Sequence, residues 1–336
     1  MIQSMDTKYA YAVSRIRVIE QQMLSGNVLQ RMIEAESAEE AFKVLKEVNY
    51  GFSANDSSVF DYERILNEEF DKVYQLLMEI APNPEAFDLF FIKNDYHNLK
   101  VYLKAELSNQ DVHNQYLAKP SLYSPAKIGD MFRERVFADL PKIMVEAIGA
   151  CFEAFSKTAD PQLIDIIMDQ ALYRHMSALA SKLGNEFISQ IVTINIDLAN
   201  LKIVLRTKLI NQGWDFLEQF LIPGGSFGID FYQDLFEYEF KDFPKAYAET
   251  QYSQLAIASM ESYKYTESLA GFEMLCDNYL VNLLKQTKFA IFGIEPLVTY
   301  LLAKEMEIKN VRIIMVGKIN HLAQDVIRER LRETYV

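Results

Sequence analysis

A seven-residue pattern that occurs three times constrains the fold of this chain more than any other feature. It consists of an acid, two variable positions, Asn, an aliphatic residue, a base and a second aliphatic residue. The copies begin at Asp95, Asp197 and Glu307, so their acids lie 102 and 110 residues apart. Average residue frequencies would give far less than one match in a chain of this length. Because the interval is close to the size of a small domain, the pattern predicts one structural unit repeated three times.

We expect the acid, the Asn and the base of each copy to act together in the fold. On a helix the acid and the Asn share one stripe, whereas the base points roughly 140° away, so the three cannot form a simple local salt bridge. The second copy lies in a segment that is apolar around most of its circumference, so its polar groups should be buried and satisfied across a helix interface. The structural motif residues are Asp95, Asn98, Lys100, Asp197, Asn200, Lys202, Glu307, Asn310 and Arg312.

The composition favours an all-α fold. Apolar residues make up 50% of the chain, which is typical of a globular protein, while only 12 Gly and 9 Pro are available for tight turns. In each repeat a breaker such as Pro82-Asn83-Pro84 separates a long helix from the helix that carries the motif. We therefore predict a helical repeat 1 with an N-terminal helix, a repeat 2, and a repeat 3 with a C-terminal helix over 319–333. Their boundaries are 1–113, 114–215 and 216–336.

Each repeat also carries an acid 26 to 30 residues before the motif acid, on the preceding long helix. These acids are candidate partners for the motif bases, and the expected pairs are Glu69 with Lys100, Asp169 with Lys202, and Asp277 with Arg312. In this interpretation the motif is a clasp that holds the two long helices of each repeat together. The alternative is that the three motifs line a shared ion or ligand site.

Charge and cysteine content restrict the partners and the compartment. With 34 Lys and Arg against 47 Asp and Glu, the net charge of −13 argues against nucleic acid and anionic lipid and favours basic or neutral protein partners. The isolated Cys151 and Cys276 are typical of buried thiols in a reducing cytosol.

No signal peptide is evident, and the apolar segment Ala290 to Ala303 contains Glu295 and Pro296 and is too short for a membrane span. We expect membrane association to be indirect.

No catalytic, cofactor or metal site is predicted. Gly224 to Gly228 matches the G-x-S-x-G pattern of hydrolases, with His321 downstream, but that chemistry requires a strand before the serine and no strand series is evident. We interpret this stretch as a linker, and a hydrolase that uses Ser226 remains an alternative. The four histidines have no acid in an ExxH or HExxH arrangement, so no metal is expected.

The three motifs, Tyr-Ala-Tyr-Ala-Val-Ser-Arg-Ile-Arg at the N-terminus and Glu-Ile-Lys-Asn-Val-Arg-Ile-Ile near the C-terminus together resemble the C subunit of prokaryotic V-type (A-type) ATPases, the counterpart of the d subunit of eukaryotic V-ATPases. The resemblance covers essentially the whole chain. The third copy departs from the pattern with Glu307, Val311 and Arg312, which are conservative changes.

The resemblance implies a funnel-like body of three similar domains around a pseudo-threefold axis. It also implies a non-catalytic rotor adaptor without a cofactor, on the cytoplasmic face of the membrane. Such an adaptor joins the central shaft, subunits D and F, to the proteolipid ring, and transmits torque for H⁺ or Na⁺ transport. We expect its rotor contacts to come from loops and helix ends, not from the motif residues. The alternative function is an all-α protein-binding scaffold outside any rotary machine.

Overall fold

The structure of the protein is a computed structural model that describes residues 7–48, 50, 58–113, 116–266 and 269–336. Helices and no strands occur in these ranges, so the all-α prediction is confirmed. The chain separates into two compact units, of which unit 1 comprises residues 1–84 and 247–336 and unit 2 comprises residues 85–246. The predicted division into three domains stays a prediction.

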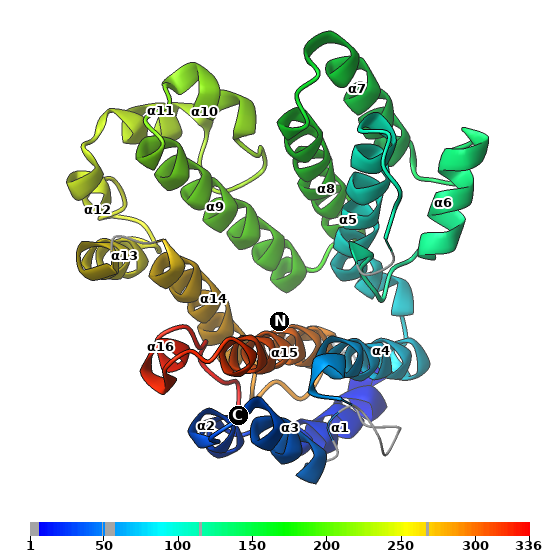
Figure 1. Ribbon diagram of the computed structural model, residues 1–336, viewed down its shortest axis with the longest axis vertical. Coiled ribbons are helices and arrows are strands. Elements are labelled where there is room, and N and C mark those ends of the chain that lie inside the picture. The colour runs from blue at the N-terminus through cyan, green and yellow to red at the C-terminus, as the bar shows by residue number, and fades with distance from the viewer. Residues whose placement is uncertain (1–6, 49, 51–57, 114–115, 267–268) are drawn as a thin grey trace. The chain divides into compact units, whose positions relative to one another are not determined.

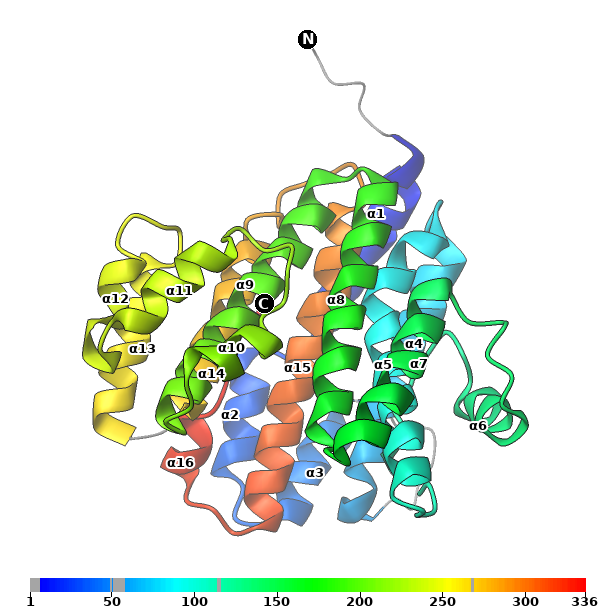
Figure 2. The same cartoon turned by 90° about the horizontal axis from the view of Figure 1, so that it is seen from above.

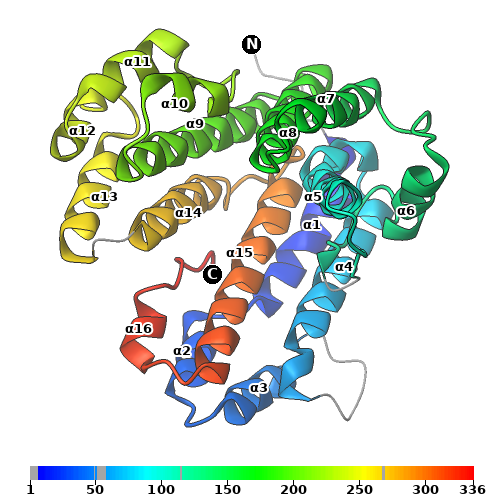
Figure 3. The same ribbon diagram turned by 45° about the horizontal axis from the view of Figure 1, so that its top comes forward.

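Unit 1 is formed by helices from both ends of the sequence (Figure 1). The α-helices are α1 (Ala10–Ile19), α2 (Gly26–Glu34), α3 (Ala38–Glu47), α4 (Tyr62–Ile80), α13 (Ser253–Thr266), α14 (Ala270–Lys285), α15 (Glu295–Ile319) and α16 (Gln324–Arg328). The 3-10 helices are η1 (Thr7–Tyr9), η2 (Glu20–Gln22) and η3 (Val59–Asp61). Helix α15 is the central element, because it packs against α1, α2, α3, α4, α14 and α16 (Figure 3).

Unit 2 is a continuous stretch of the chain, and α8 is its central helix, packed against α5, α7 and α9. The α-helices are α5 (Asp88–Leu107), α6 (Pro125–Glu134), α7 (Lys142–Thr158), α8 (Gln162–Leu183), α9 (Glu186–Leu209), α10 (Trp214–Phe220), α11 (Ile229–Glu237) and α12 (Phe243–Ala246). The 3-10 helices are η4 (Pro84–Phe87), which begins at the unit boundary, and η6 (Phe240–Asp242).

Local sequence signals explain several helix ends. Ser37 caps α3 by accepting a hydrogen bond from the amide of Glu40, as its capping pattern predicts. Gly184 ends α8 with a positive φ of 64°, a conformation that costs glycine little. The next residue, Asn185, caps α9 through the amide of Ile188. These adjacent signals place a sharp break directly before the second motif helix.

The motif helices α5, α9 and α15 form where they were predicted, but other expectations were wrong. Instead of a C-terminal helix over 319–333, α15 continues to Ile319, α16 spans only Gln324–Arg328, and residues 331–336 are not helical. Helices α2 and α10 were not predicted. The sequence also predicts a polar loop over 53–58, and most of it lies outside the described residues.

The helix that could cross a membrane by length and composition is α9, and not the segment 290–303. In the described part of the chain it is the one helix that is long and apolar enough to cross a membrane, with a mean hydropathy of 1.4. However, 61% of this apolar window is buried inside the structure. The side chains of α9 therefore largely contact other protein side chains, as in a core helix.

Candidate functional site

Each motif Asn binds the backbone of a residue 20 to 22 positions later in the chain. Asn98 on α5 donates from Nδ2 to the carbonyl of Ala118 over 3.1 Å and accepts from the amide of Ala118 over 2.7 Å. The corresponding distances are 2.8 and 2.8 Å between Asn200 and Ile222, and 3.0 and 2.8 Å between Asn310 and Arg332. All three asparagines are fully buried. The carboxamide thus replaces a backbone peptide group and satisfies one buried donor and one buried acceptor.

These contacts hold the segment of chain that follows each motif helix. We define the return segments as residues 116–124, 221–228 and 329–336, because in each the chain has turned back along its motif helix. Ala118, Ile222 and Arg332 lie outside the helices, and among the described residues no backbone group bonds to their backbone. The motif Asn therefore supplies hydrogen-bond partners that secondary structure does not. We call the contacts between a motif and its return segment a clamp, and number the clamps 1 to 3 in chain order.

In the first two copies, the motif acid binds the same return segment a few residues further on. The carboxylate of Asp95 accepts from the amides of Leu122 and Tyr123 over 3.1 and 2.9 Å. The carboxylate of Asp197 accepts from the amide of Ser226 over 2.7 Å. Acid and Asn, one helical turn apart, therefore fix two successive points of one segment.

The third acid has a different partner. Glu307 Oε2 accepts from the amide of Leu24 over 2.5 Å, and its other oxygen accepts from Lys304 over 2.8 Å. Leu24 belongs to the N-terminal part of the chain, 283 residues earlier. This contact joins the two sequence segments that form unit 1.

The amides bound by the acids share one position, just before a short helix. Leu24 and Tyr123 each precede a serine that is the N-cap of α2 or α6, and Ser226 lies two residues before the N-cap of α11. The short helices α2, α6 and α11 therefore begin at corresponding positions relative to the three motif acids. In the third copy the Asn still holds its return segment, but the acid binds the entry to α2.

The motif bases do not form the predicted pairs. Lys100 binds Asp169 over 2.8 Å and lies 3.9 Å from Asp165, so it contacts α8. Arg312 binds Glu63 on α4 through two bonds of 2.7 and 3.0 Å. The four side chains are 21% to 45% exposed, so each pair contributes little energy.

The remaining predicted partners are also engaged elsewhere. Asp277 binds Arg332 over 2.7 Å and also Lys309. Lys202 has no ion pair within the described residues. The predictions failed because equal spacing along the chain does not determine which neighbouring helix a long side chain reaches.

A buried charge cluster in unit 1 was not predicted. Lys304 Nζ lies 2.8 Å from a carboxylate oxygen of Glu69 and 2.8 Å from one of Glu307, and 4.8 Å from the ring centroid of Tyr50. Burial alone would lower the pKa of Lys304, but Glu307 and Glu69 raise it above its ordinary value. Lys304 therefore stays charged and links α15 to α4. The available sequence signal was a lysine three residues before the motif acid in an apolar stretch.

The environment of Asp95 also affects its protonation. Burial raises its pKa to about 6, although the hydrogen bonds from the amides of Tyr123 and Leu122 lower it. Desolvation therefore outweighs the two backbone donors.

The glycine-rich stretch 224–228 forms part of the second clamp, in which Asp197 binds the amide of Ser226. A Cβ on Gly225 would lie 2.3 Å from Oδ1 of Asp197, so only glycine allows this close approach. Ser226 lies between helices α10 and α11, not at a strand-to-helix turn, and it belongs to unit 2 whereas His321 belongs to unit 1. The local geometry thus matches the linker interpretation and lacks the elements of a hydrolase nucleophile.

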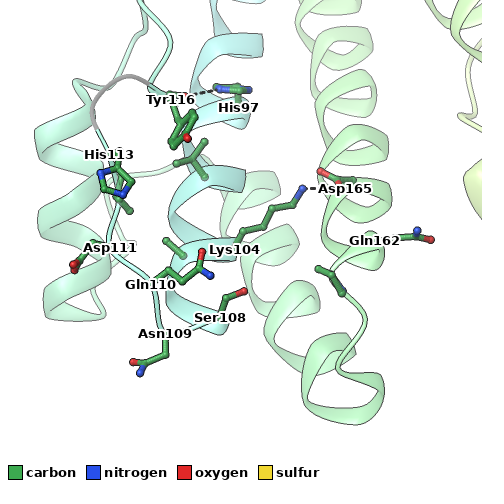
Figure 4. A pocket seen from close by; sticks show the side chains of 14 residues that line it. His97, Lys104, Ser108, Asn109, Gln110, Asp111, His113, Tyr116, Gln162 and Asp165 are labelled. Atoms are coloured by element: carbon green, nitrogen blue, oxygen red, sulfur yellow. Dashed lines mark hydrogen bonds and ion pairs between the residues drawn. The ribbon is translucent and has the colours of Figure 1, made fainter.

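An open pocket in unit 2 lies between the end of α5, the segment after it and the start of α8 (Figure 4). Its volume is about 1160 Å³, and two pairs of its lining residues bond to each other. Lys104 binds Asp165 over 2.7 Å, and His97 Nε2 lies 2.8 Å from the carbonyl oxygen of Tyr116. Among the described residues there is no group of three His, Cys, Asp or Glu that could hold a metal ion. The pocket has no evident catalytic arrangement.

Comparison with known proteins gives a consistent result. The profile of the ATP synthase (C/AC39) subunit family matches residues 12–330. The C subunit of a V-type sodium ATPase from Enterococcus hirae is 28% identical over 320 residues, which cover 95% of this chain and 97% of the relative. The C subunits of the A-type ATP synthases from Methanocaldococcus jannaschii and Pyrococcus abyssi are 23% and 24% identical, covering 96% and 92% of this chain and 86% of each relative.

Proposed function

Because the chain belongs to the ATP synthase (C/AC39) subunit family, we propose that it is the rotor adaptor of a V/A-type rotary ATPase. It joins the central shaft, subunits D and F, to the membrane proteolipid ring. It catalyses no reaction, and it transmits torque between ATP turnover and H⁺ or Na⁺ transport. The observation that carries the proposal is the family match over residues 12–330, supported by relatives of similar length that are C subunits of V-type and A-type enzymes.

The packing of the chain suits this mechanical task. Torque passes through a protein without loss only if its helices do not slide past one another. In unit 1, the buried Lys304 cluster and the contact between Glu307 and Leu24 link α15 to α4 and to the entry of α2. In unit 2, two clamps hold the segments that connect α5 to α6 and α10 to α11. These contacts favour a stiff body.

For the motif residues we propose a structural role as clasps, without direct contact with the shaft or the ring. Asp95, Asn98, Asp197, Asn200, Glu307 and Asn310 are buried, and their polar groups bind backbone within their own unit. Lys100 and Arg312 bind neighbouring helices, whereas Lys202 has no ion pair within the described residues. Rotor contacts then come from loops and helix ends. The protein is peripheral at the cytoplasmic face, attached through the ring and without a span of its own.

Two alternatives make different predictions. An all-α scaffold outside any rotary machine would bind neither the shaft nor the ring, and the family match is evidence against it. A hydrolase that depends on Ser226 would lose its activity in the Ser226→Ala variant.

Reconstitution tests the proposed function directly. Purified shaft, proteolipid ring and this chain are mixed, and the ring is recovered by an affinity tag. We expect the shaft to be recovered with the ring only when this chain is present. Recovery of the shaft without the chain, or failure of the chain to bind either component, would reject the adaptor role.

A further inference from the structure

The surroundings of the first motif helix recur around the third, but with helices from the other end of the sequence. In unit 2, the neighbours of α5 include α6, α7 and α8, which follow it in the chain. In unit 1, the neighbours of α15 include α2, α3 and α4, which lie near the N-terminus (Figure 2). The two sets also begin and end alike, because α6 and α2 have 10 and 9 residues and α8 and α4 have 22 and 19.

The motif acid holds the first helix of each set at the same position. The carboxylate of Asp95 accepts from the amide of Tyr123, directly before the N-cap serine of α6. The carboxylate of Glu307 accepts from the amide of Leu24, directly before the N-cap serine of α2. The two contacts differ in the length of chain that they close, which is 28 residues in the first case and 283 in the second.

The motif bases reach corresponding acids as well. Lys100 lies 3.9 Å from Asp165 in the first turn of α8, and Arg312 binds Glu63 in the first turn of α4 over 2.7 Å. Asp165 and Glu63 each lie 32 residues before the next motif acid in the sequence. Each base therefore contacts the long helix that leads to the next motif, and for the third motif the next one is the first.

From these correspondences we propose that the repeats are cyclic and that one of them is split between the two ends of the sequence. We call α5 with α6, α7 and α8 the first bundle, and α15 with α2, α3 and α4 the third bundle. The third bundle is then a circular permutation of the first. The contact between Glu307 and Leu24 is a latch, which closes noncovalently what the peptide chain closes in the first bundle. The inference does not depend on the proposed function.

This assignment differs from a division of the chain at residues 113 and 215. That division places α2, α3 and α4 in one repeat with α5, whereas the cyclic assignment places them with α15. The two assignments therefore disagree about which helices share a core and about where the chain can be opened without loss of the fold.

A circular permutant exchanges the two kinds of closure. A flexible linker joins residue 336 to residue 1, and the chain is opened between Pro120 and Ser121, just before the amides that Asp95 binds. The third bundle then becomes continuous, and Asp95 becomes the latch of the first bundle. The control has the same linker but is opened between Gly149 and Ala150, in the middle of α7.

The linker has to pass along α1. Tyr335 binds Glu20, and the helical chain from Glu20 back to Thr7 is roughly 20 Å long. A Gly–Ser linker of about 16 residues has an average end-to-end distance of roughly 22 Å and can be extended much further. It therefore joins the two ends without strain.

We expect the permutant to keep the helix content of the wild type in circular dichroism, with a urea midpoint within about 0.5 M of the wild-type value. Its Tyr123 amide should stay protected from hydrogen exchange, because Asp95 still binds it. The control should unfold at a lower urea concentration, because a helix is broken. A permutant that is unfolded, or no more stable than the control, would overturn the cyclic assignment.

Matched substitutions in the unpermuted chain provide a second test. Leu99→Ala and Val311→Ala each truncate a fully buried aliphatic side chain directly after a motif Asn. Because helices that share a core open together, we expect Val311→Ala to speed amide exchange in α2 and α3 at least about tenfold, and Leu99→Ala to do so in α6 and α7. Faster exchange of α2 and α3 in Leu99→Ala, with no change in Val311→Ala, would overturn the cyclic assignment in favour of a division at residue 113.

Discussion

Asn200 and the backbone of Ile222 exchange two hydrogen bonds, both 2.8 Å long, inside unit 2. The same exchange joins Asn98 to Ala118 and Asn310 to Arg332, and all three asparagines are fully buried. Asparagine suits this position because its side chain offers a donor and an acceptor in the geometry of a peptide group. The repeated sequence motif therefore corresponds to a repeated contact, in which a buried Asn binds a segment of chain that has no secondary structure.

Removing the Asn200 side chain should destabilise the protein measurably. Asn200→Ala leaves the amide and the carbonyl of Ile222 buried without partners, which costs about 2 to 4 kcal/mol. Urea denaturation measures the loss, and hydrogen exchange should show a faster-exchanging Ile222 amide.

The matched control is Asn195→Ala on the same helix. Asn195 donates only to the carbonyl of Ile191 within α9, so we expect a change below about 1 kcal/mol. Equal losses of unfolding free energy in the two variants would contradict the conclusion that the clamp stabilises the fold.

Gly225→Ala should destabilise unit 2 through the second clamp. The new methyl group would lie 2.3 Å from Asp197 Oδ1, an atom already held by the amide of Ser226. Either the carboxylate or the return segment must move, and we expect a loss of about 1 to 3 kcal/mol.

Gly149→Ala should have the opposite effect and serves as the control. Gly149 is exposed within α7, and a Cβ there would meet no atom within 4 Å. Alanine should therefore stabilise the helix by about 0.5 to 1 kcal/mol. Thermal unfolding curves of both variants should shift in opposite directions; a shift in the same direction would count against the close contact at Gly225.

The sequence predicted the helices well and the contacts of the motif poorly. Long amphipathic segments and strong breakers such as Gly184-Asn185 act locally. The helices that the sequence predicts over 61–80, 160–183 and 186–210 are therefore close to the observed α4, α8 and α9. The partners of Asn98 and Asp95 are backbone groups, which every residue carries. No side-chain pattern could therefore identify them.

The C-terminal segment shows how tertiary contacts override local preference. Residues 319–333 alternate charged and apolar side chains in a way that favours a helix. However, Asn310 binds the backbone of Arg332, Asn278 binds the amide of Glu333, and Tyr335 donates to Glu20 over 3.3 Å. These contacts require a non-helical chain, and they involve residues far away in the sequence. Tertiary contacts outweigh the weak preference of a short helix.

Stability should depend on pH through Asp95. Burial raises its pKa to about 6, so the folded state holds the proton more tightly than the unfolded state does. The stabilisation by this proton is complete below about pH 4 and is lost as the pH rises through 6, which amounts to about 3 kcal/mol. The free-energy difference between wild type and Asp95→Asn should change by this order between pH 4 and pH 7. A carboxyl carbon of Asp95 that titrates near pH 4 in NMR spectra would contradict the prediction.

Lys304→Met should be among the most destabilising single substitutions in unit 1. Lys304 is buried between the carboxylates of Glu69 and Glu307, so its loss leaves the buried Glu307 without an ion pair and leaves Glu69 paired with the more exposed Lys72. We expect a loss of about 3 to 5 kcal/mol in urea denaturation, because breaking one side of a buried ion cluster costs far more than an exposed pair contributes.

The control is Lys157→Met, which removes an exposed lysine paired with Glu153 and should cost less than about 1 kcal/mol.

A triple variant that adds Glu69→Gln and Glu307→Gln to Lys304→Met should recover much of the loss. It removes the negative charges that Lys304 neutralised, while Gln at position 307 can still accept from the amide of Leu24. If the triple variant were less stable than Lys304→Met, the two carboxylates would be stabilising without the lysine. Because the cluster joins α4 to α15, recovery in the triple variant would locate the cost of Lys304→Met in uncompensated charge, not in lost packing between the two helices.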